Sequence, residues 1–216
     1  LRAAGVPVAG PSANLSGRPS PTTAAEALRD MDGRVDMIID GGAAAIGVES
    51  TIVEVLEQVV TILRPGGVTE EMLAGFTPYV TMDAHLLTDT GAPKAPGMKY
   101  RHYAPSAPMR VFVGSVAAVA AAMEAARHTA AGDKKAVGYL VSAETAERLG
   151  LFDEPFYTWG RHGVKEELAA NVYTGLLFFD DNPVDLIHAE GVTTGGIGTA
   201  VMNRLKKAAG GAVVDV

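Results

Sequence analysis

The second half of the chain alternates short apolar runs with longer amphipathic stretches. Short apolar runs are typical of buried strands, and apolar positions three or four residues apart are typical of helices. The apolar runs predict strands at 110–113, 136–141, 156–159 and 184–188. The amphipathic stretches predict helices at 116–128, 143–149, 164–179 and 199–208. Strands that alternate with helices in this way predict an α/β fold with a parallel sheet between two layers of helices.

The first 80 residues have a less regular pattern. Apolar runs predict strands at 6–9 and 37–40, and a hairpin of 51–56 with 59–63 that turns at Glu57 and Gln58. Thr23-x-x-Glu26 is a capping box that predicts a helix ending near Met31, and Thr69 is placed to cap a short helix at 70–74. The periodicity fades between residues 77 and 93.

A segment rich in basic and aromatic residues, PGMKYRHYAP at positions 96–105, lies between the two parts. Its Pro-Gly start and Ala-Pro end disfavour a helix or a central strand, so we expect an extended connector, which we call the strap. Lys99, Arg101, His102 and Tyr103 are side chains that can hold a phosphate. The alternative is a solvated basic linker whose tyrosines dock on a neighbouring domain.

Polar side chains also gather in the loops of the first part. Ser12 and Asn14 are two residues apart, so in an extended segment both point to one face and can hold a polar ligand; a turn stabilised by its own side chains is the alternative. Arg64 precedes Pro-Gly-Gly, where it suits either an anion or a surface ion pair. We expect Ser12, Asn14, Ser50 and Arg64 to line one cavity at strand ends.

Composition narrows the function classes. With 216 residues, 48% hydrophobic and 20% charged, the chain is typical of one large or two small globular domains. It has no cysteine, no apolar run of membrane-spanning length and no signal peptide, so we expect a cytoplasmic protein without membrane contact. A net charge of -7 argues against a general nucleic-acid surface but leaves room for a local cation cluster that binds a small anion.

Familiar catalytic templates are absent from the sequence: there is no Walker A motif, no zinc-spaced histidine pair and no Gly-x-Ser-x-Gly elbow. The turn Gly195-Gly196-Ile197-Gly198 fails as a dinucleotide fingerprint, because Val201 occupies the third glycine position. Trp159, Arg161 and His162 have catalytic-looking side chains, but no partner motif accompanies them and we expect them to be structural.

Several motifs, in order along the chain, resemble the long, two-domain form of L-threonylcarbamoyladenylate synthase. They are Gly10-Pro11-Ser12-Ala13-Asn14-Leu15-Ser16-Gly17, Glu49-Ser50-Thr51-Ile52-Val53, Leu63-Arg64-Pro65-Gly66, the strap, and Ala200-Val201-Met202-Asn203-Arg204-Leu205. The resemblance implies the C-terminal part of a YrdC-like catalytic domain at 1–80, a linker at 81–107 and a Rossmann-like domain at 108–216. It also implies that the family's N-terminal half, with a Lys-x-Arg nucleotide motif, precedes Leu1.

The resemblance implies a reaction as well. The family converts L-threonine, bicarbonate and ATP into threonylcarbamoyl-adenylate and pyrophosphate, the first step of threonylcarbamoyladenosine formation in transfer RNA. The residues it implies for nucleotide or phosphate binding are Ser12, Asn14, Arg64, Lys99, Arg101, His102 and Tyr103, and those for threonine are Ser50 and Thr51. No residue is assigned as a covalent catalyst, and no side chain as a metal ligand; magnesium is expected to bridge the phosphates.

The expected partners are the substrates and the downstream machinery that transfers the threonylcarbamoyl group to transfer RNA, without stable nucleic-acid binding by this chain. If the chain is a natural truncation, a nucleotide-sensing or RNA-binding module is the alternative. Without the upstream Lys-x-Arg pair, residues 1–216 alone are not expected to turn over ATP, because each lost charge-assisted contact costs about 1.5–3 kcal/mol of binding free energy.

Overall fold

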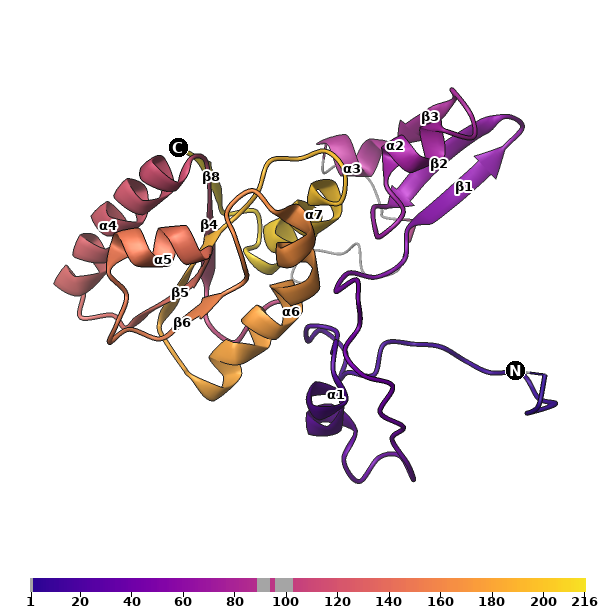
Figure 1. Ribbon diagram of the computed structural model, residues 1–216, viewed down its shortest axis with the longest axis horizontal. Coiled ribbons are helices and arrows are strands. Elements are labelled where there is room, and N and C mark those ends of the chain that lie inside the picture. The colour runs from indigo at the N-terminus through magenta and orange to yellow at the C-terminus, as the bar shows by residue number, and fades with distance from the viewer. Residues whose placement is uncertain (1, 89–93, 96–102) are drawn as a thin grey trace.

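The computed structural model describes residues 2–88, 94–95 and 103–216. It contains two separate sheets, one of three strands in the first part of the chain and one of five strands in the second (Figure 1). The first part lies beside one helical layer of the second part, and its N-terminal residues extend away from that layer. None of the helices within the described ranges has the length and apolarity needed to cross a bilayer.

The larger sheet has the strand order β6-β5-β7-β4-β8, and every neighbouring pair is parallel. Its strands are β4 (Met109–Val113), β5 (Val137–Val141), β6 (Phe156–Thr158), β7 (Leu186–Glu190) and β8 (Val213–Asp215). Helices α4 (Val116–Gly132) and α5 (Ala143–Leu149) cover one face, and α6 (Lys165–Asp181) and α7 (Gly198–Ala208) cover the other (Figure 1). The predicted α/β fold with a parallel sheet is confirmed.

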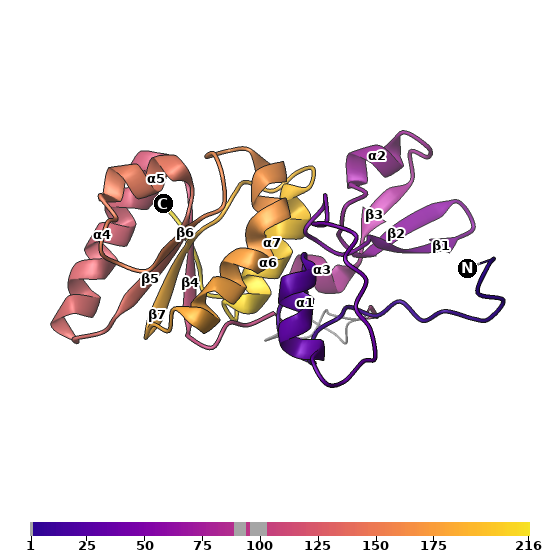
Figure 2. The ribbon, with the colours of Figure 1, turned by 60° about the horizontal axis from the view of Figure 1, so that its bottom comes forward.

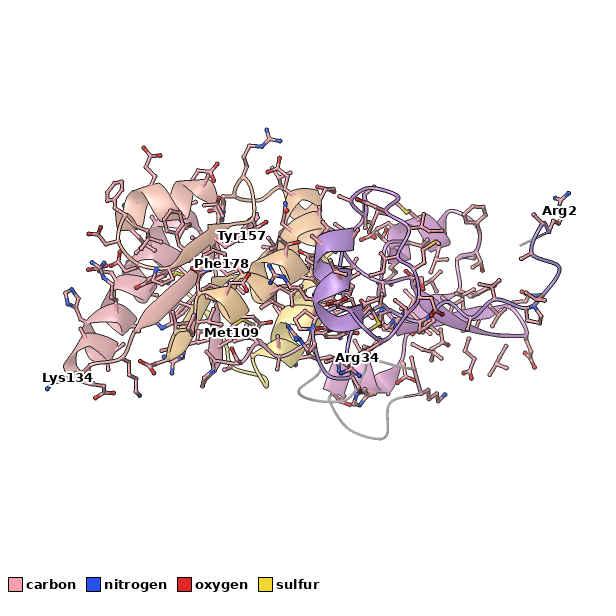
Figure 3. All side chains as sticks on the ribbon, turned by 90° about the horizontal axis from the view of Figure 1, so that it is seen from below. Arg2, Arg34, Met109, Lys134, Tyr157 and Phe178 are labelled. Atoms are coloured by element: carbon pink, nitrogen blue, oxygen red, sulfur yellow. The ribbon has the colours of Figure 1, made fainter. Side chains whose placement is uncertain are left out.

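Alternation along the strands builds a core on each face of this sheet. In β5, Val137, Tyr139 and Val141 belong to the cluster beneath α4 and α5, whereas Leu140 belongs to the cluster beneath α6 and α7. Beside the second cluster, the rings of Tyr157 and Phe178 lie 5.8 Å apart, centroid to centroid (Figure 3). Both faces are therefore buried, as is usual for parallel sheets.

The smaller sheet carries the predicted hairpin. β1 (Ile52–Leu56) and β2 (Val59–Arg64) are antiparallel, and β3 (Val80–Met82) adds a parallel strand beside β2. α2 (Glu70–Ala74) packs beside β3, and α3 (Ala84–Thr88) follows β3 in the chain. α1 (Ala24–Met31) lies apart from this sheet, next to α6 (Figure 1). The capping box of α1 is formed as predicted: the Thr23 hydroxyl accepts from the Glu26 amide, and the Glu26 carboxylate accepts from the Thr23 amide.

Two expected strands are not formed. Residues 6–9 and 37–40 lie outside every helix and strand, and Val6, Val8, Met37 and Ile39 are largely exposed. An apolar run becomes a strand only when another strand pairs with it, and no described residue pairs with these two. Conversely, β3, α3 and β8 are elements that the sequence pattern did not predict.

The first part of the chain packs directly on α6. A Cβ atom added to Gly47 would lie 2.2 Å from the carbonyl oxygen of Ala169, so the backbone at residue 47 touches the backbone of the helix. Next to it, the Thr22 and Thr174 hydroxyls are 3.1 Å apart. Figure 2 shows α1 beside the layer of α6 and α7. This contact, which we call the junction, positions the candidate site.

Candidate functional site

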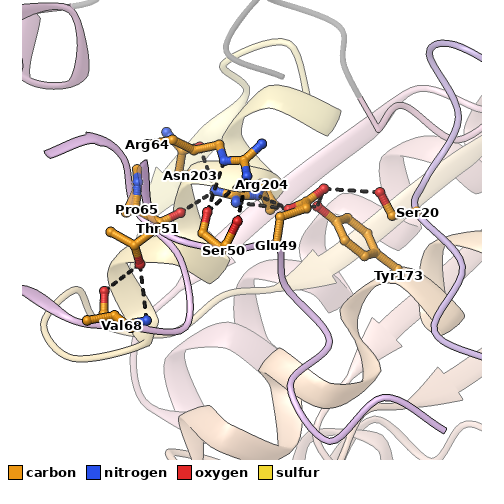
Figure 4. Close-up of polar contacts among 10 residues, drawn as sticks. All are labelled: Ser20, Glu49, Ser50, Thr51, Arg64, Pro65, Val68, Tyr173, Asn203 and Arg204. Carbon is orange, nitrogen blue, oxygen red and sulfur yellow. Dashed lines mark hydrogen bonds and ion pairs between the residues drawn. The ribbon is translucent and has the colours of Figure 1, made fainter. Parts of the chain in front are cut away.

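Arg64 and Ser50 lie next to each other at the open end of the hairpin. Arg64 ends β2, Ser50 precedes β1, and the strand register places Ile52 opposite Arg64. The Arg64 guanidinium donates to the Ser50 carbonyl oxygen from Nε at 3.2 Å and from Nη2 at 2.9 Å (Figure 4). Its Nη2 also lies 3.4 Å from the Ser50 hydroxyl. The structure thus brings together two residues predicted to share a site, with a cation beside a hydroxyl.

The neighbouring residue, Glu49, is the centre of a hydrogen-bond network that crosses the junction (Figure 4). Its carboxylate accepts from the Ser20 hydroxyl at 3.0 Å, the Tyr173 hydroxyl at 2.9 Å and Arg204 Nε at 2.9 Å. Arg204 Nη2 also lies 2.9 Å from Glu49 Oε2, an ion-pair distance without hydrogen-bond alignment. Arg204 Nη1 donates to the Pro65 carbonyl oxygen at 2.9 Å.

This network is buried and charged. The Arg204 side chain is fully buried, and the Glu49 side chain is 19% exposed. Burial alone would raise the pKa of Glu49, but the Arg204 charge and the hydrogen bonds to the carboxylate outweigh it and hold that pKa below its usual value. Burial raises the pKa of the Tyr173 hydroxyl, although Arg204 opposes this shift. Glu49 is therefore ionised and Tyr173 is neutral near pH 7.

Thr51 is occupied by a contact within the first part of the chain. Its hydroxyl donates to the Val68 carbonyl at 2.6 Å and accepts from the Val68 amide at 3.1 Å. This pair of bonds holds the loop after β2 against the start of β1. A role of Thr51 in holding threonine stays a prediction, and it would use the remaining lone pair of this hydroxyl.

Ser12 and Asn14 lie on a different segment, before α1. The Asn14 amide donates to the carbonyl oxygens of Leu15 at 2.8 Å and Arg18 at 3.1 Å, which is the turn considered as the alternative. Its Oδ1 is buried without a hydrogen-bond partner among the described residues, so an acceptor remains available. Ser12 is exposed. That these two residues share a cavity with Ser50 and Arg64 stays a prediction.

Of the strap residues assigned to phosphate binding, the structure describes Tyr103. Lys99, Arg101 and His102 lie outside the described residues, and the predicted phosphate contacts of these three residues and of Tyr103 stay predictions. The Tyr103 side chain is 2% exposed and its ring centroid is 5.2 Å from that of Tyr173. The guanidinium carbon of Arg204 lies 5.8 Å from the Tyr103 ring centroid. The end of the strap is therefore fixed on the second part of the chain.

A cavity of about 570 Å³ lies beside this network, between β3, α3 and α7. Its lining includes Pro65, Met82, Asn203 and Lys206 but none of the four residues predicted to share a cavity. In the described ranges, no group of three or more histidine or acidic side chains is placed to hold a metal ion.

Trp159, Arg161 and His162, which were expected to be structural, make packing and ion-pair contacts. Trp159 is fully buried in the core, and Arg161 forms an ion pair with Glu167. His162 Nδ1 lies 2.6 Å from the carboxylate of Glu190, which is fully buried. Their structural role stays a prediction.

Sequence reasoning missed the network around Glu49. Glu49 and Arg204 both lie in quoted motifs, but nothing in the sequence pairs them across 155 positions. Tyr173 gave no signal, since it is one of many apolar residues in the amphipathic pattern of α6. Arg204 occupies a helix position at which the apolar pattern of α7 places core residues. This is the one hint in the sequence that a carboxylate partner is needed.

Comparisons with known proteins cover nearly the whole chain. The family described as "Threonylcarbamoyl-AMP synthase, C-terminal domain" matches residues 52–210, and the family described as "Telomere recombination" matches residues 1–66. The threonylcarbamoyl-AMP synthase of Bacillus subtilis (strain 168) is 41% identical over 215 residues, 99% of this chain and 60% of the relative. That of Pyrococcus abyssi is 40% identical over 213 residues, 97% of this chain and 60% of the relative.

A solved structure agrees with these relatives. The crystal structure of P. abyssi Sua5 complexed with L-threonine matches with a TM-score of 0.84 and 39% identity, covering 95% of this chain and 58% of that chain. This chain thus spans about three fifths of the relatives that it matches. Matches at this identity over almost every residue establish the family. The chain belongs to the threonylcarbamoyl-AMP synthase family.

Proposed function

We propose that the protein carrying this chain is a threonylcarbamoyl-AMP synthase, which joins L-threonine, bicarbonate and ATP and releases pyrophosphate. The observation that carries the proposal is the placement of Arg64 on the Ser50 loop, in a chain of this family. A fixed cation beside a hydroxyl suits a reaction between two anions, the carbamate and the triphosphate. The P. abyssi relative has been crystallised with L-threonine, which supports this amino acid as a substrate.

The proposed reaction depends on positioning the reactants and does not need covalent catalysis. The threonine amine adds to bicarbonate, which loses water to give a carbamate. A carbamate oxygen then bonds to the α-phosphorus of ATP, and the bond to the β-phosphate breaks, so that pyrophosphate leaves with the electron pair. Holding two reactants in line supplies much of the rate of such a transfer, and fixed positive charge offsets the charge that develops on phosphate oxygens.

Each proposed site residue has a separate part in this reaction. Arg64 supplies positive charge beside the Ser50 loop, while the Ser12 and Ser50 hydroxyls and the buried Oδ1 of Asn14 offer neutral polar contacts. Lys99, Arg101 and His102 are proposed to contact the phosphates from the strap, and Tyr103 anchors the end of that strap beside Tyr173. A strap closed over the reactants would also exclude the water that hydrolyses an adenylate.

Magnesium is proposed to enter with ATP. The described residues offer no cluster of carboxylates or histidines for a metal ion, which fits an ion held mainly by phosphate oxygens and water. The product is a mixed anhydride of a carbamic acid and AMP, which is activated for transfer of its acyl group, and a downstream enzyme that acts on transfer RNA is proposed to consume it. Stable nucleic-acid binding is not proposed for this chain, whose net charge is -7.

The test is pyrophosphate release from ATP by the full-length protein, measured with and without threonine and bicarbonate. We expect release to require both, and Arg64→Ala to lower kcat/KM about 10- to 100-fold, the effect of one charge-assisted contact. The control is Arg161→Ala, which removes an exposed ion pair with Glu167 and leaves kcat/KM unchanged. Release that is independent of threonine, or an Arg64→Ala variant with full activity, would contradict the proposal.

A further inference from the structure

Arg204, a residue of the second part of the chain, is bound to the loop that carries the candidate site. We propose that Arg204 is a positioning residue for the reaction: it acts through Glu49 and Pro65 to fix Ser50 and Arg64 relative to each other. The inference rests on the proposed function and assigns to the second domain a part in catalysis.

The covalent neighbours of both site residues contact the same guanidinium. Arg204 Nε is 2.9 Å from the carboxylate of Glu49, which precedes Ser50 in the chain. Arg204 Nη1 is 2.9 Å from the carbonyl oxygen of Pro65, which follows Arg64. Glu49 lies three residues before β1, and Pro65 directly follows β2. One planar group with a fixed geometry therefore holds the segment before β1 and the segment after β2 together.

The loop has little space in which to move if this group is displaced. A Cβ atom on Gly66 would lie 2.3 Å from the Glu49 carbonyl oxygen, so the two backbone segments are already in contact. The Gly67 amide donates to the same oxygen at 3.4 Å. On the other side, Gly47 touches the backbone of α6. A shift of Glu49 is therefore transmitted to Ser50 rather than absorbed by the loop.

The same network reaches the strap. Tyr103 packs on Tyr173, whose hydroxyl donates to Glu49. The centroid of the Tyr103 ring lies 5.8 Å from the Arg204 guanidinium carbon. Arg204 thus contacts both the end of the strap and the neighbours of the site. A misplacement of about 1 Å at a reacting group can cost roughly 100-fold in rate, so small shifts in this network are expected to lower turnover.

A purely structural ion pair is the competing explanation, and the two differ in kinetics. A structural pair lowers the fraction of folded enzyme but leaves kcat per folded molecule intact. A positioning residue lowers kcat in a protein that remains folded, while the KM for ATP changes less, because the residues that contact the phosphates are all still present. Lysine at position 204 keeps the charge but has no planar fork to contact Glu49 and Pro65 together.

The experiment compares Arg204→Lys and wild type as full-length protein, by pyrophosphate release and by thermal unfolding. We expect kcat to fall at least tenfold, with the KM for ATP within about threefold, at a temperature where the variant is folded. The matched control is Asp180→Asn, which removes another ion pair across the junction, to Arg18, 2.6 Å in length. It should keep kcat within twofold.

A second variant serves if Arg204→Lys does not fold. Arg204→Ala leaves space for a guanidinium ion, and millimolar guanidinium is expected to restore at least a tenth of the wild-type turnover. Wild-type turnover in Arg204→Lys, or a loss equal to that of Asp180→Asn, would overturn the positioning role of Arg204 and leave the proposed function standing. A wild-type protein without threonine-dependent pyrophosphate release would overturn the proposed function and, with it, this inference.

Discussion

His188 lies in the middle of β7 and is fully buried. Its ring is edge-on to those of Phe112 and Tyr139, at centroid distances of 5.3 and 5.7 Å. Neither ring nitrogen has a hydrogen-bond partner among the described residues. Burial, helped by the nearby Arg110 charge, lowers the pKa of His188 from 6.5 to about 4. The ring therefore behaves as an apolar aromatic group at neutral pH.

This pKa predicts how stability depends on pH. In the unfolded chain His188 takes up a proton near pH 6.5, whereas in the folded chain it does so only near pH 4. Stability is therefore lost as the pH falls from about 6.5 to 4, with about 2 kcal/mol lost between pH 7 and pH 5 from this group. Urea unfolding at both pH values, followed by the fluorescence of Trp159, the one tryptophan, measures the change.

His188→Phe should remove this part of the pH dependence while keeping the ring contacts. The control is His128→Gln, since the His128 side chain is 78% exposed and has no buried environment to lose. If the wild type and His188→Phe lose the same free energy of unfolding between pH 7 and pH 5, the low pKa of His188 is wrong.

For single residues, the sequence predicted contacts within the hairpin. Ser50 and Arg64 were expected together because both lie at strand ends, and the hairpin register brings the start of β1 next to the end of β2. The partners of Glu49 could not be predicted in the same way. They come from α6 and α7, and such long-range contacts depend on how the two parts pack rather than on any local pattern.

Among the elements, the starts of the helices with side-chain caps were predicted correctly. Thr23, Thr69, Ser115 and Ser142 each accept a backbone N–H at the start of a helix, and this signal lies within a few residues of sequence. Strands depend on neighbours that are distant in sequence, which explains why 6–9 and 37–40 were predicted as strands and β8 was not.

The junction provides a prediction at this scale. Gly47→Ala would place a Cβ atom 2.2 Å from the Ala169 carbonyl oxygen and 2.5 Å from that of Ala170, and backbone atoms of a helix cannot move aside cheaply. We expect the segment around residue 47 to leave α6. Hydrogen exchange should then be at least tenfold faster at the Ala44 amide, which donates to Thr22 at 2.8 Å.

Gly41→Ala is the matched control for this variant. It lies six positions away, and nothing lies within 4 Å of its added Cβ atom. Its exchange rates at Ala44 and Gly67 should equal those of the wild type. Equal protection in Gly47→Ala would mean that the segment and α6 are not held in contact.

For the whole molecule, the second part of the chain has a core on both faces of its sheet, and apart from Val48 the buried residues of both clusters fall between Tyr103 and Ala208. We expect residues 108–216 to fold when expressed alone. Arg204 would then lack Glu49 and Pro65 and would face water. Arg204→Met should change the free energy of unfolding by less than about 0.5 kcal/mol in this piece, as for an ordinary surface residue.

The same substitution in residues 1–216 should cost about 3 kcal/mol, because it leaves Glu49 as a buried charge without its partner. Urea unfolding reported by Trp159 measures both values, since this residue is buried in the core of the second part of the chain. An equal cost in the two polypeptides would show that Arg204 stabilises its own domain and not the junction.

The distance in sequence between Glu49 and Arg204 also has a consequence during synthesis. The two residues are separated by 155 positions. Because a ribosome adds about 5–20 residues per second, Arg204 is synthesised roughly 8–30 s after Glu49. In that interval the hairpin can form, but the carboxylate has to remain hydrated and the segment around Gly47 has no helix to pack on. The loop that carries Ser50 therefore reaches its final geometry only when the last helix of the chain has been translated and has folded.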